Sequence, residues 1–380
     1  MRDGWRSARF RDVLDIVSGR NQRAVESESG PYPIYGSGGV IGRASDYLCE
    51  AGTTIIGRKG SINSPIFVDR PFWNVDTAFG LAPKDGLDPK FLFRFCELYD
   101  FARHNKGTTL PSLVKTDLLA IAMPVPPPAE QRRIVGILDE AFDGIATARQ
   151  NAERNLRNAR ALFESYLDSV FSRPGEGWTE RHLAQAVEAT CTLSYGIVQP
   201  GEEYPNGLPV VRPMDLTTKT ISASGLKRID PKRADSYQRT RLHGGELLLC
   251  VRGSTGVVSV ASTELASANV TRGIVPVRFD SAAITQDFGY YLLRSDAVQR
   301  QVRQKTYGAA LMQINIRDVR GIGVWYPSLK EQAAFVARLD KVSAITESLE
   351  ANSQRKLAVL DELRQSLLQQ AFSGRLLSTP

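Results

Sequence analysis

The chain has 380 residues, of which 42% are hydrophobic, which is enough to bury a core in two or three domains and excludes a disordered tail. Lysine and arginine total 48 against 41 acidic residues, and a basic balance of this kind favours a nucleic-acid partner without requiring one. The polar start, and the lack of a run of about 18 apolar residues, predict a cytoplasmic protein with no membrane partner.

The first part of the chain contains a glycine-rich stretch, PIYGSGGVIG, from Pro33 to Gly42. Several glycines together let a backbone turn tightly and approach a partner closely, so we interpret this stretch as a binding loop. It is not a dinucleotide fingerprint, because the third glycine of that motif would fall at Ile41 and no strand-to-helix unit surrounds it. Further along, Asp88 and Pro89 are typical of the N-cap and first residue of a helix.

A long helix is predicted after the proline-rich stretch Pro124 to Pro128, with Glu130 suited to its positive end. Its apolar residues are spaced as in a coiled coil, with one extra residue, a stutter, after Ala148. Gly136 and Gly144 lower helix stability, and a close helix crossing or a bend there would explain them. The predicted seam consists of Ile134, Leu138, Ala141, Ile145, Ala148, Ala152, Leu156, Ala159, Phe163, Tyr166 and Val170.

This helical segment occurs twice, because Glu130 to Phe171 aligns without a gap on Glu331 to Phe372. The same offset continues upstream and pairs Gly107 with Gly308 and Leu110 with Leu311. At a different offset, Gly4-Trp5 matches Gly177-Trp178. The order of the chain is therefore domain, helix, domain, helix.

The second helix has the same kind of apolar stripe, and Gly374 provides its stop. One helix of this kind would be interpreted as a surface helix of its own domain. Two copies in one register instead favour a pair of helices that bury their apolar stripes against each other. The second stripe consists of Leu339, Val342, Thr346, Leu349, Ser353, Leu357, Leu360 and Leu367.

Several segments make the chain similar to specificity subunits of type I restriction-modification systems. In the first half these are YPIYGSGGVIG, GTTLPSLVKTDLLAIAMPVPPPAEQRRI and SYLDSVFSRPGEGW, and in the second half YGIVQPG, GGELLLCVRGSTG and LLQQAFSGRLL. The resemblance covers essentially the whole chain and implies an α+β fold. In that fold, two mixed α/β target recognition domains are separated by two long antiparallel helices that form a coiled coil with a pseudo-two-fold repeat. We expect recognition domains at 1–125 and 176–325, and helices at 126–175 and 326–380.

The resemblance also implies that each domain recognises one half of a split, asymmetric site in double-stranded DNA, while the helices set the gap. Base recognition needs side chains with paired donors and acceptors on a surface held by phosphate contacts. The loops GRKGSIN and HNKGTT in the first domain, and VRGSTG and KTYGAALMQIN in the second, combine both kinds. The candidate DNA-binding residues are Arg58, Lys59, Ser61, Asn63, Lys106, Thr108, Thr109, Arg212, Arg252, Ser254, Thr255, Lys305, Tyr307, Gln313 and Asn315.

No catalytic residues are predicted in this chain. The N-P-P-Y-type motif of adenine methyltransferases and the Walker P-loop do not occur, and the four cysteines and three histidines are too scattered for a zinc site or a disulfide framework. By resemblance, catalysis belongs to partner subunits. Two modification subunits would bind S-adenosylmethionine and dock around the helices, and restriction subunits would use ATP with Mg²⁺.

Two alternatives stay open at this stage. The chain could serve another DNA-modification or defence assembly, which the neighbouring genes would reveal, or it could be a coiled-coil adaptor whose domains bind protein. DNA affinity that falls steeply with rising salt would count against the adaptor. The target sequence cannot be derived from the loops, because DNA shape adds preference without contact.

Overall fold

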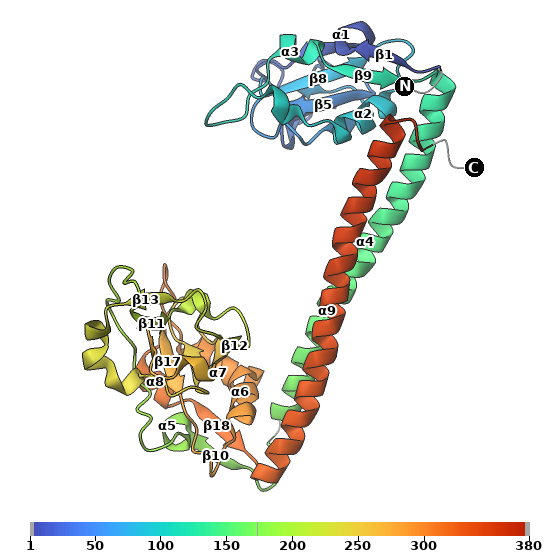
Figure 1. The fold of residues 1–380 in the computed structure, drawn as a ribbon. Helices are drawn as coiled ribbons and strands as arrows, with labels where there is room; N and C mark the ends of the chain where they lie inside the picture. Colours follow the sequence, from blue (N-terminus) through green and yellow to red (C-terminus); the bar gives the residue numbers. More distant parts are fainter. Residues whose placement is uncertain (1–3, 173, 377–380) are drawn as a thin grey trace. The chain divides into compact units, whose positions relative to one another are not determined.

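The computed structural model describes residues 4–172 and 174–376, so Arg173 and Leu377 of the quoted segments lie outside the described residues. The chain divides into two compact units (Figure 1). The first comprises Met1–Arg154 and Ser353–Pro380, and the second comprises Asn155–Asn352. Each unit therefore contains one globular part and a segment of both long helices.

The first unit is built on an antiparallel four-stranded sheet and a smaller three-stranded sheet. The larger sheet has the order β2 (Leu14–Ser18), β8 (Ala78–Pro83), β5 (Thr53–Gly57), β6 (Ile66–Val68), and the smaller β4 (Gly39–Ala44), β3 (Tyr32–Gly36), β7 (Trp73–Asn74). A further pair joins β1 (Arg6–Arg9) to β9 (Ala122–Val125). The helices are α1 (Phe10–Val13), α2 (Pro89–Leu98), the 3₁₀ helix η1 (Phe101–His104) and α3 (Lys115–Leu119).

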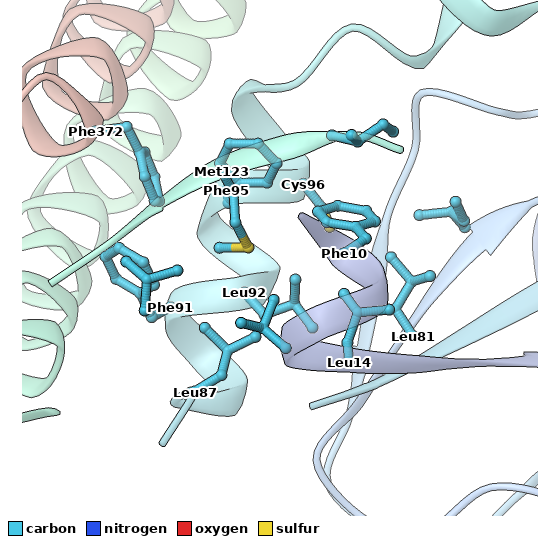
Figure 2. Packing of buried hydrophobic residues seen from close by; sticks show 14 of the residues in the cluster. Phe10, Leu14, Leu81, Leu87, Phe91, Leu92, Phe95, Cys96, Met123 and Phe372 are labelled. Carbon is cyan, nitrogen blue, oxygen red and sulfur yellow. The ribbon is translucent and has the colours of Figure 1, made fainter. Parts of the chain in front are cut away.

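The core of the first unit joins the sheet to the end of the second long helix. Phe91 and Phe95 of α2 pack on Phe372, with ring centroids 4.9 and 5.5 Å apart, and Phe10 is fully buried beside them (Figure 2). Asp88 caps α2 as predicted, because its side chain accepts hydrogen bonds from the Lys90 and Phe91 amides. Burial of these aromatic rings fixes the globular part to the helix.

The second unit repeats this plan with shorter strands. A four-stranded sheet has the order β12 (Thr220–Ile221), β15 (Val258–Ala261), β14 (Leu247–Cys250), β17 (Ile274–Val277), and a three-stranded sheet β13 (Lys227–Ile229), β11 (Leu208–Val211), β16 (Asn269–Val270). The pair β10 (Thr179–His182) and β18 (Gly323–Tyr326) matches β1 and β9. The helices are α5 (Leu183–Ala186), η2 (Pro213–Asp215), η3 (Pro231–Thr240), η4 (Thr263–Leu265), α6 (Gln286–Arg294), α7 (Asp296–Lys305) and α8 (Ile316–Arg320).

Equivalent hydrogen bonds confirm both repeat offsets. The amide of Phe10 donates to the carbonyl of Ile121 at 2.9 Å, and that of Leu183 donates to Ile322 at 2.8 Å. The glycines of the two Gly-Trp pairs also share a left-handed conformation, with φ of +81° at Gly4 and +84° at Gly177. The two halves thus have one backbone plan in spite of their different sequences.

The two predicted long helices are α4 (Pro128–Phe171) and α9 (Leu329–Phe372), each of 44 residues. Pro128 begins α4 as expected. At the start of α9, Glu331 was expected only to place its negative charge at the positive helix end. Its carboxylate also accepts hydrogen bonds from both the amide (3.2 Å) and the hydroxyl (2.6 Å) of Ser328. Gly374 follows the last turn with φ +78°, which confirms the predicted stop.

Within each unit the two helices run antiparallel, as predicted. In the first unit Arg149 of α4 pairs with Asp361 of α9, whereas Phe142, earlier in α4, lies under Arg364, later in α9, at 4.8 Å. In the second unit Arg160 and Glu350 pair at 3.1 Å. Residue numbers rise along one helix as they fall along the other, which defines the direction of pairing.

The predicted stutter in α4 is wrong. Ala148 is exposed, and Ile145, Ala152 and Ala159 are buried at uninterrupted steps of seven residues. Leu349 of the predicted α9 stripe is likewise 45% exposed. The expectation of a close crossing at the α4 glycines is wrong too, because nothing lies within 4 Å of a Cβ built on Gly136 or Gly144.

Candidate nucleic-acid interface

In the first domain the two predicted loops lie against each other and are joined by backbone hydrogen bonds. The amide of Leu113 donates to the carbonyl of Arg58 at 2.8 Å, and that of Gly60 donates to Pro111 at 3.0 Å. Within the second loop, the amide of Lys106 donates to Ser112 at 2.9 Å. The segments 57–63 and 104–113 therefore form one surface, which we call the first loop pair.

The second domain contains the same arrangement in 250–256 and 305–315, the second loop pair. The Ile314 amide donates to Val251 at 3.0 Å and the Gly253 amide to Met312 at 2.8 Å. The Tyr307 amide donates to the Gln313 carbonyl at 2.9 Å. These three hydrogen bonds correspond one to one with those of the first loop pair. The two loop pairs also align in sequence. Lys59 thus corresponds to Arg252, Ser61 to Ser254, Ser112 to Gln313 and Lys106 to Tyr307.

Glycines shape both loop pairs at equivalent positions. Gly60 and Gly253 each have φ +82°, in the left-handed region that glycine adopts without strain. A Cβ on Gly107 would lie 1.9 Å from the carbonyl oxygen of Leu110, and one on Gly308 would lie 2.3 Å from that of Leu311. Only glycine fits such an approach, so the loop tips have the same backbone while their side chains differ.

Most of the predicted residues present their side chains to solvent. Lys59, Ser61, Lys106, Thr108, Thr109, Ser254 and Tyr307 are exposed, and Arg58, Arg252, Thr255, Lys305 and Gln313 are partly buried. Among the ion pairs of residues 4–172 and 174–376, none involves Arg58, Lys59, Arg252 or Lys305. Lys106 pairs with Asp117 at 3.5 Å, near the protein surface. The other four cations therefore have no carboxylate partner among the described residues.

Several predicted residues are engaged within the protein. Asn63 donates to Asp100 at 2.8 Å and accepts from the Phe101 amide at 2.8 Å. The guanidinium of Arg58 donates to the Asp76 carbonyl at 3.3 Å and lies over Phe79. These contacts orient the first loop pair.

In the second domain, Arg212 and Tyr307 are also engaged. Arg212 forms two side-chain hydrogen bonds with Asp215, at 2.8 and 3.1 Å, and these bonds and the Asp215 charge raise the pKa of the arginine. Tyr307 donates to Asn315 at 2.6 Å. The structure brings Tyr307 and Asn315 together in the second loop pair, whereas Arg212 lies in the neighbouring segment before η2.

The sequence interpretation missed the apolar side chains at the loop tips. Leu110 is 55% exposed and Leu311 46%, and their equivalence was visible in the repeat offset. In the β3–β4 hairpin, Val40 and Ile41 follow the flagged glycines and are 60% and 57% exposed. The hairpin lies beside the first loop pair, since the Ser37 hydroxyl is 3.7 Å from a Cβ built on Gly60. The sequence signal that could have predicted these exposed side chains was an apolar pair directly after two consecutive glycines.

Other kinds of site were also sought in the described part of the chain. There, no three His, Cys, Asp or Glu side chains gather as metal ligands would, and none of the helices is long and apolar enough to cross a bilayer. The four cysteines are free and buried, and burial raises the pKa of Cys49 to about 12.

Comparison with known proteins gives one consistent result. Residues 2–154 match the family model described as "Type I restriction modification DNA specificity domain". The specificity subunit of the EcoBI type I restriction enzyme of Escherichia coli is 22% identical over 347 residues, covering 85% of this chain and 73% of that protein. That of EcoDI, also from E. coli, is 19% identical and covers 98% of this chain and 88% of that protein.

The chain is similar to specificity subunits of type I restriction enzymes over most of its length, and residues 2–154 match their DNA specificity domain. Solved structures show that the fold is shared as well. A chain from work on complex assembly and conformational transition of the type I R-M system matches with a TM-score of 0.79 at 20% identity, covering 99% of both chains. The HsdS subunit from Thermoanaerobacter tengcongensis matches at 0.59 and 19% identity, covering 99% of this chain and 98% of that one. The structure has the predicted α+β class, with mixed helices and sheets in both units.

Proposed function

We propose that this chain is a specificity subunit that recognises DNA sequence for a type I restriction-modification complex, with each domain binding one half of a bipartite, asymmetric site. The observation that carries the proposal is the double occurrence of the loop pair. Three backbone hydrogen bonds and two glycine positions are equivalent in the two domains, yet the exposed side chains differ. Two copies of one frame with different side chains are what two different half-sites require.

The division of labour within each loop pair follows from its chemistry. Lys59 and Arg252, at equivalent positions, would contact phosphate and set the position of the loops on the duplex. The neighbouring polar groups, Ser61 and Thr108 in one domain and Ser254 and Gln313 in the other, would face base edges. Asn63, Asn315 and Arg212 support the loops through the internal bonds described above, and of the predicted residues they have the weakest case for touching DNA.

The chain itself is not an enzyme in this proposal. Its partners would be two modification subunits, which supply S-adenosylmethionine-dependent methylation, and restriction subunits, which use ATP and Mg²⁺. The helices α4 and α9 would dock the modification subunits and set the spacer between half-sites. The domain limits of 1–125, 126–175, 176–325 and 326–380 belong to this proposal, and the cytoplasmic location stays a prediction.

The test is to co-express the chain with its neighbouring methyltransferase gene in an unmethylated host and to map modified adenines by long-read sequencing. We expect a split motif with two different halves. Replacing one domain by that of another specificity subunit should then change one half only. A soluble complex that modifies no defined motif would contradict sequence recognition and favour the protein-binding adaptor. If the neighbouring genes belong to another modification or defence assembly, the same mapping identifies it.

A further inference from the structure

The tip of the second loop pair contains four consecutive apolar residues that are exposed. Ala309, Ala310, Leu311 and Met312 are all exposed, the last two at 46% and 43%. Single exposed apolar residues are common, but a run of four on a protein surface is unfavourable unless it has a function. We call residues 309–312 the apolar strip.

The strip is held in place by its neighbours. Gly308 turns the chain with φ +120°, and the carbonyl of Met312 accepts from the Gly253 amide at 2.8 Å. Behind it, Tyr307 and Gln313 exchange backbone hydrogen bonds of 2.9 and 2.8 Å. A surface fixed at both ends loses little conformational entropy when it binds, so its shape can discriminate between ligands.

Charge indicates which ligand the strip faces. Arg252 corresponds to Lys59 and lies in the segment bonded to Met312, and Lys305 precedes the strip by four residues. Among the ion pairs of the described residues, neither cation has a carboxylate partner. An apolar strip next to cations suits a polyanion with an apolar feature on its surface, which double-stranded DNA has in its major groove.

We propose that the apolar strip recognises the C5-methyl groups of thymine in the half-site bound by the second domain. This inference rests on the proposed function. Alanine and leucine side chains have no hydrogen-bonding groups and methionine has only a weak acceptor. They cannot distinguish bases by donor and acceptor pattern. The thymine methyl is the apolar group on the major-groove edge of the base pairs, and Ala side chains pack against it well.

The first domain offers a built-in comparison. At the positions of Ala309 and Ala310 it has Thr108 and Thr109, both exposed, on the same backbone frame. Their hydroxyls can donate to and accept from base edges. The second half-site is therefore the one whose recognition depends most on methyl groups, and the leucines at 110 and 311 are the element common to both tips.

The experiment uses the complex of this chain with its modification subunits and the motif found by methylation mapping. Each thymine of the second half-site is replaced in turn by deoxyuridine, which removes only the methyl group. Dissociation constants come from competition binding. We expect at least one position to weaken binding about fourfold, since a buried methyl is worth about 0.8 kcal/mol and 1.4 kcal/mol is a factor of ten.

Two variants connect the effect to the strip. In the double variant Ala310→Gly, Leu311→Ala, the ratio of affinities for thymine and deoxyuridine DNA at that position should fall towards one. The matched control is Leu110→Ala in the first domain, which should leave this ratio unchanged. Circular dichroism checks that both variants fold.

The outcomes separate the inference from the proposed function. A complex that methylates a split motif but tolerates deoxyuridine throughout the second half-site overturns the inference and leaves the proposed function intact. A second half-site without any A·T pair does the same. If Leu311 instead inserted between base steps as a wedge, binding would also be insensitive to deoxyuridine, and the inference would again be overturned. If no motif is recognised, the proposed function itself fails.

Discussion

Gln131 and Gln332, 201 residues apart in sequence and both fully buried, make the same three hydrogen bonds in the two halves of the molecule. Gln131 accepts from the Asp88 amide (2.7 Å) and donates to the carbonyls of Pro126 (2.8 Å) and Gly86 (2.9 Å). Gln332 accepts from the Thr285 amide (2.8 Å) and donates to Pro327 (2.9 Å) and Ala283 (2.7 Å). Each glutamine joins the first turn of a long helix to the loop that precedes α2 or α6, and so fixes how the helix leaves its domain.

Replacing Gln332 by leucine should therefore destabilise the second unit strongly. One amide and two carbonyls would lose their partner, and an unsatisfied buried polar group costs about 1–3 kcal/mol. We expect a loss of about 3 kcal/mol in the free energy of unfolding, measured by urea denaturation. The control is Gln304→Leu, at an exposed position of α7, which should change stability by less than about 0.5 kcal/mol. Equal effects of the two substitutions would show that the hydrogen bonds are dispensable.

The carboxylate of Asp139 connects α2 to α4 and makes the stability of the first unit depend on pH. It accepts from Arg94 at 2.7 Å and from Lys90 at 2.9 Å. Partial burial alone would raise the pKa of Asp139, but the hydrogen bonds and charges of Arg94 and Lys90 outweigh it and lower the pKa. The carboxylate therefore stabilises the fold above the pKa of an unfolded aspartate, about 3.9, and this contribution is lost as the pH falls through the lowered folded value.

The corresponding prediction is that Asp139→Asn lowers the melting temperature at neutral pH, and that the difference from the unmodified chain shrinks in acid. Melting curves between pH 7 and pH 3 would show it. Asp143→Asn, at an exposed position of the same helix, is the matched control and should show a much smaller difference. A difference for Asp139→Asn that stays constant down to pH 3 would contradict the assigned ionic role.

The sequence predicted the frame of the molecule better than its contacts. Internal similarity located both long helices, because repeated segments keep their spacing even where residues change. Internal similarity could not show which of two neighbouring stripes on α4 faces the partner helix. The apolar Ala148 was assigned to the seam in preference to the charged Arg149. The choice depends on the partner helix, where Asp361 neutralises Arg149.

The loop residues were predicted by the same kind of argument, from residue type, and the result has the same limits. Donor-rich side chains near glycines indicated two loops in each domain, and the structure places these loops against each other. Residue type could not show that Asn63 is bound by Asp100, 37 positions away. The pairing of Arg212 with Asp215 could have been predicted more easily, since the two residues are only three positions apart. The exposed leucines were overlooked because apolar residues are expected in a core.

The salt dependence of DNA binding provides a test of the equivalence between Lys59 and Arg252. Each substitution by alanine should weaken binding across all sequences and lower the slope of log K against log salt by about one, because one phosphate contact is lost. Lys59 is the better single target in its domain, since Arg58 also supports the loop through Asp76. Replacing Arg58 and Lys59 together should weaken binding further or alter one half-site. Unchanged affinity and an unchanged motif for the double variant would remove this loop from the interface.

The last prediction is that the length of the two long helices determines the length of the spacer between the half-sites. Adding a single turn, about 5.4 Å, to α4 alone would shift the buried stripe, because Ile145, Ala152 and Ala159 are seven residues apart. We therefore expect the cleanest result from one extra heptad in both helices, after Ala152 in α4 and after Ser353 in α9. Each insertion adds about 10.5 Å of helix, or about three base pairs at 3.4 Å each.

Methylation mapping of this variant should find both half-sites unchanged and the spacer about three base pairs longer. The control keeps the length and replaces exposed residues of the same heptad by alanine, and its spacer should be the original one. If the lengthened chain still binds its modification subunits and methylates the original motif, the helices do not set the spacer. A variant that loses both half-sites together would instead show that the added heptads disturb folding or assembly, so the complex is first checked by size-exclusion chromatography. Only a changed spacer between unchanged halves fits a helix pair that fixes the distance between two independent recognition domains.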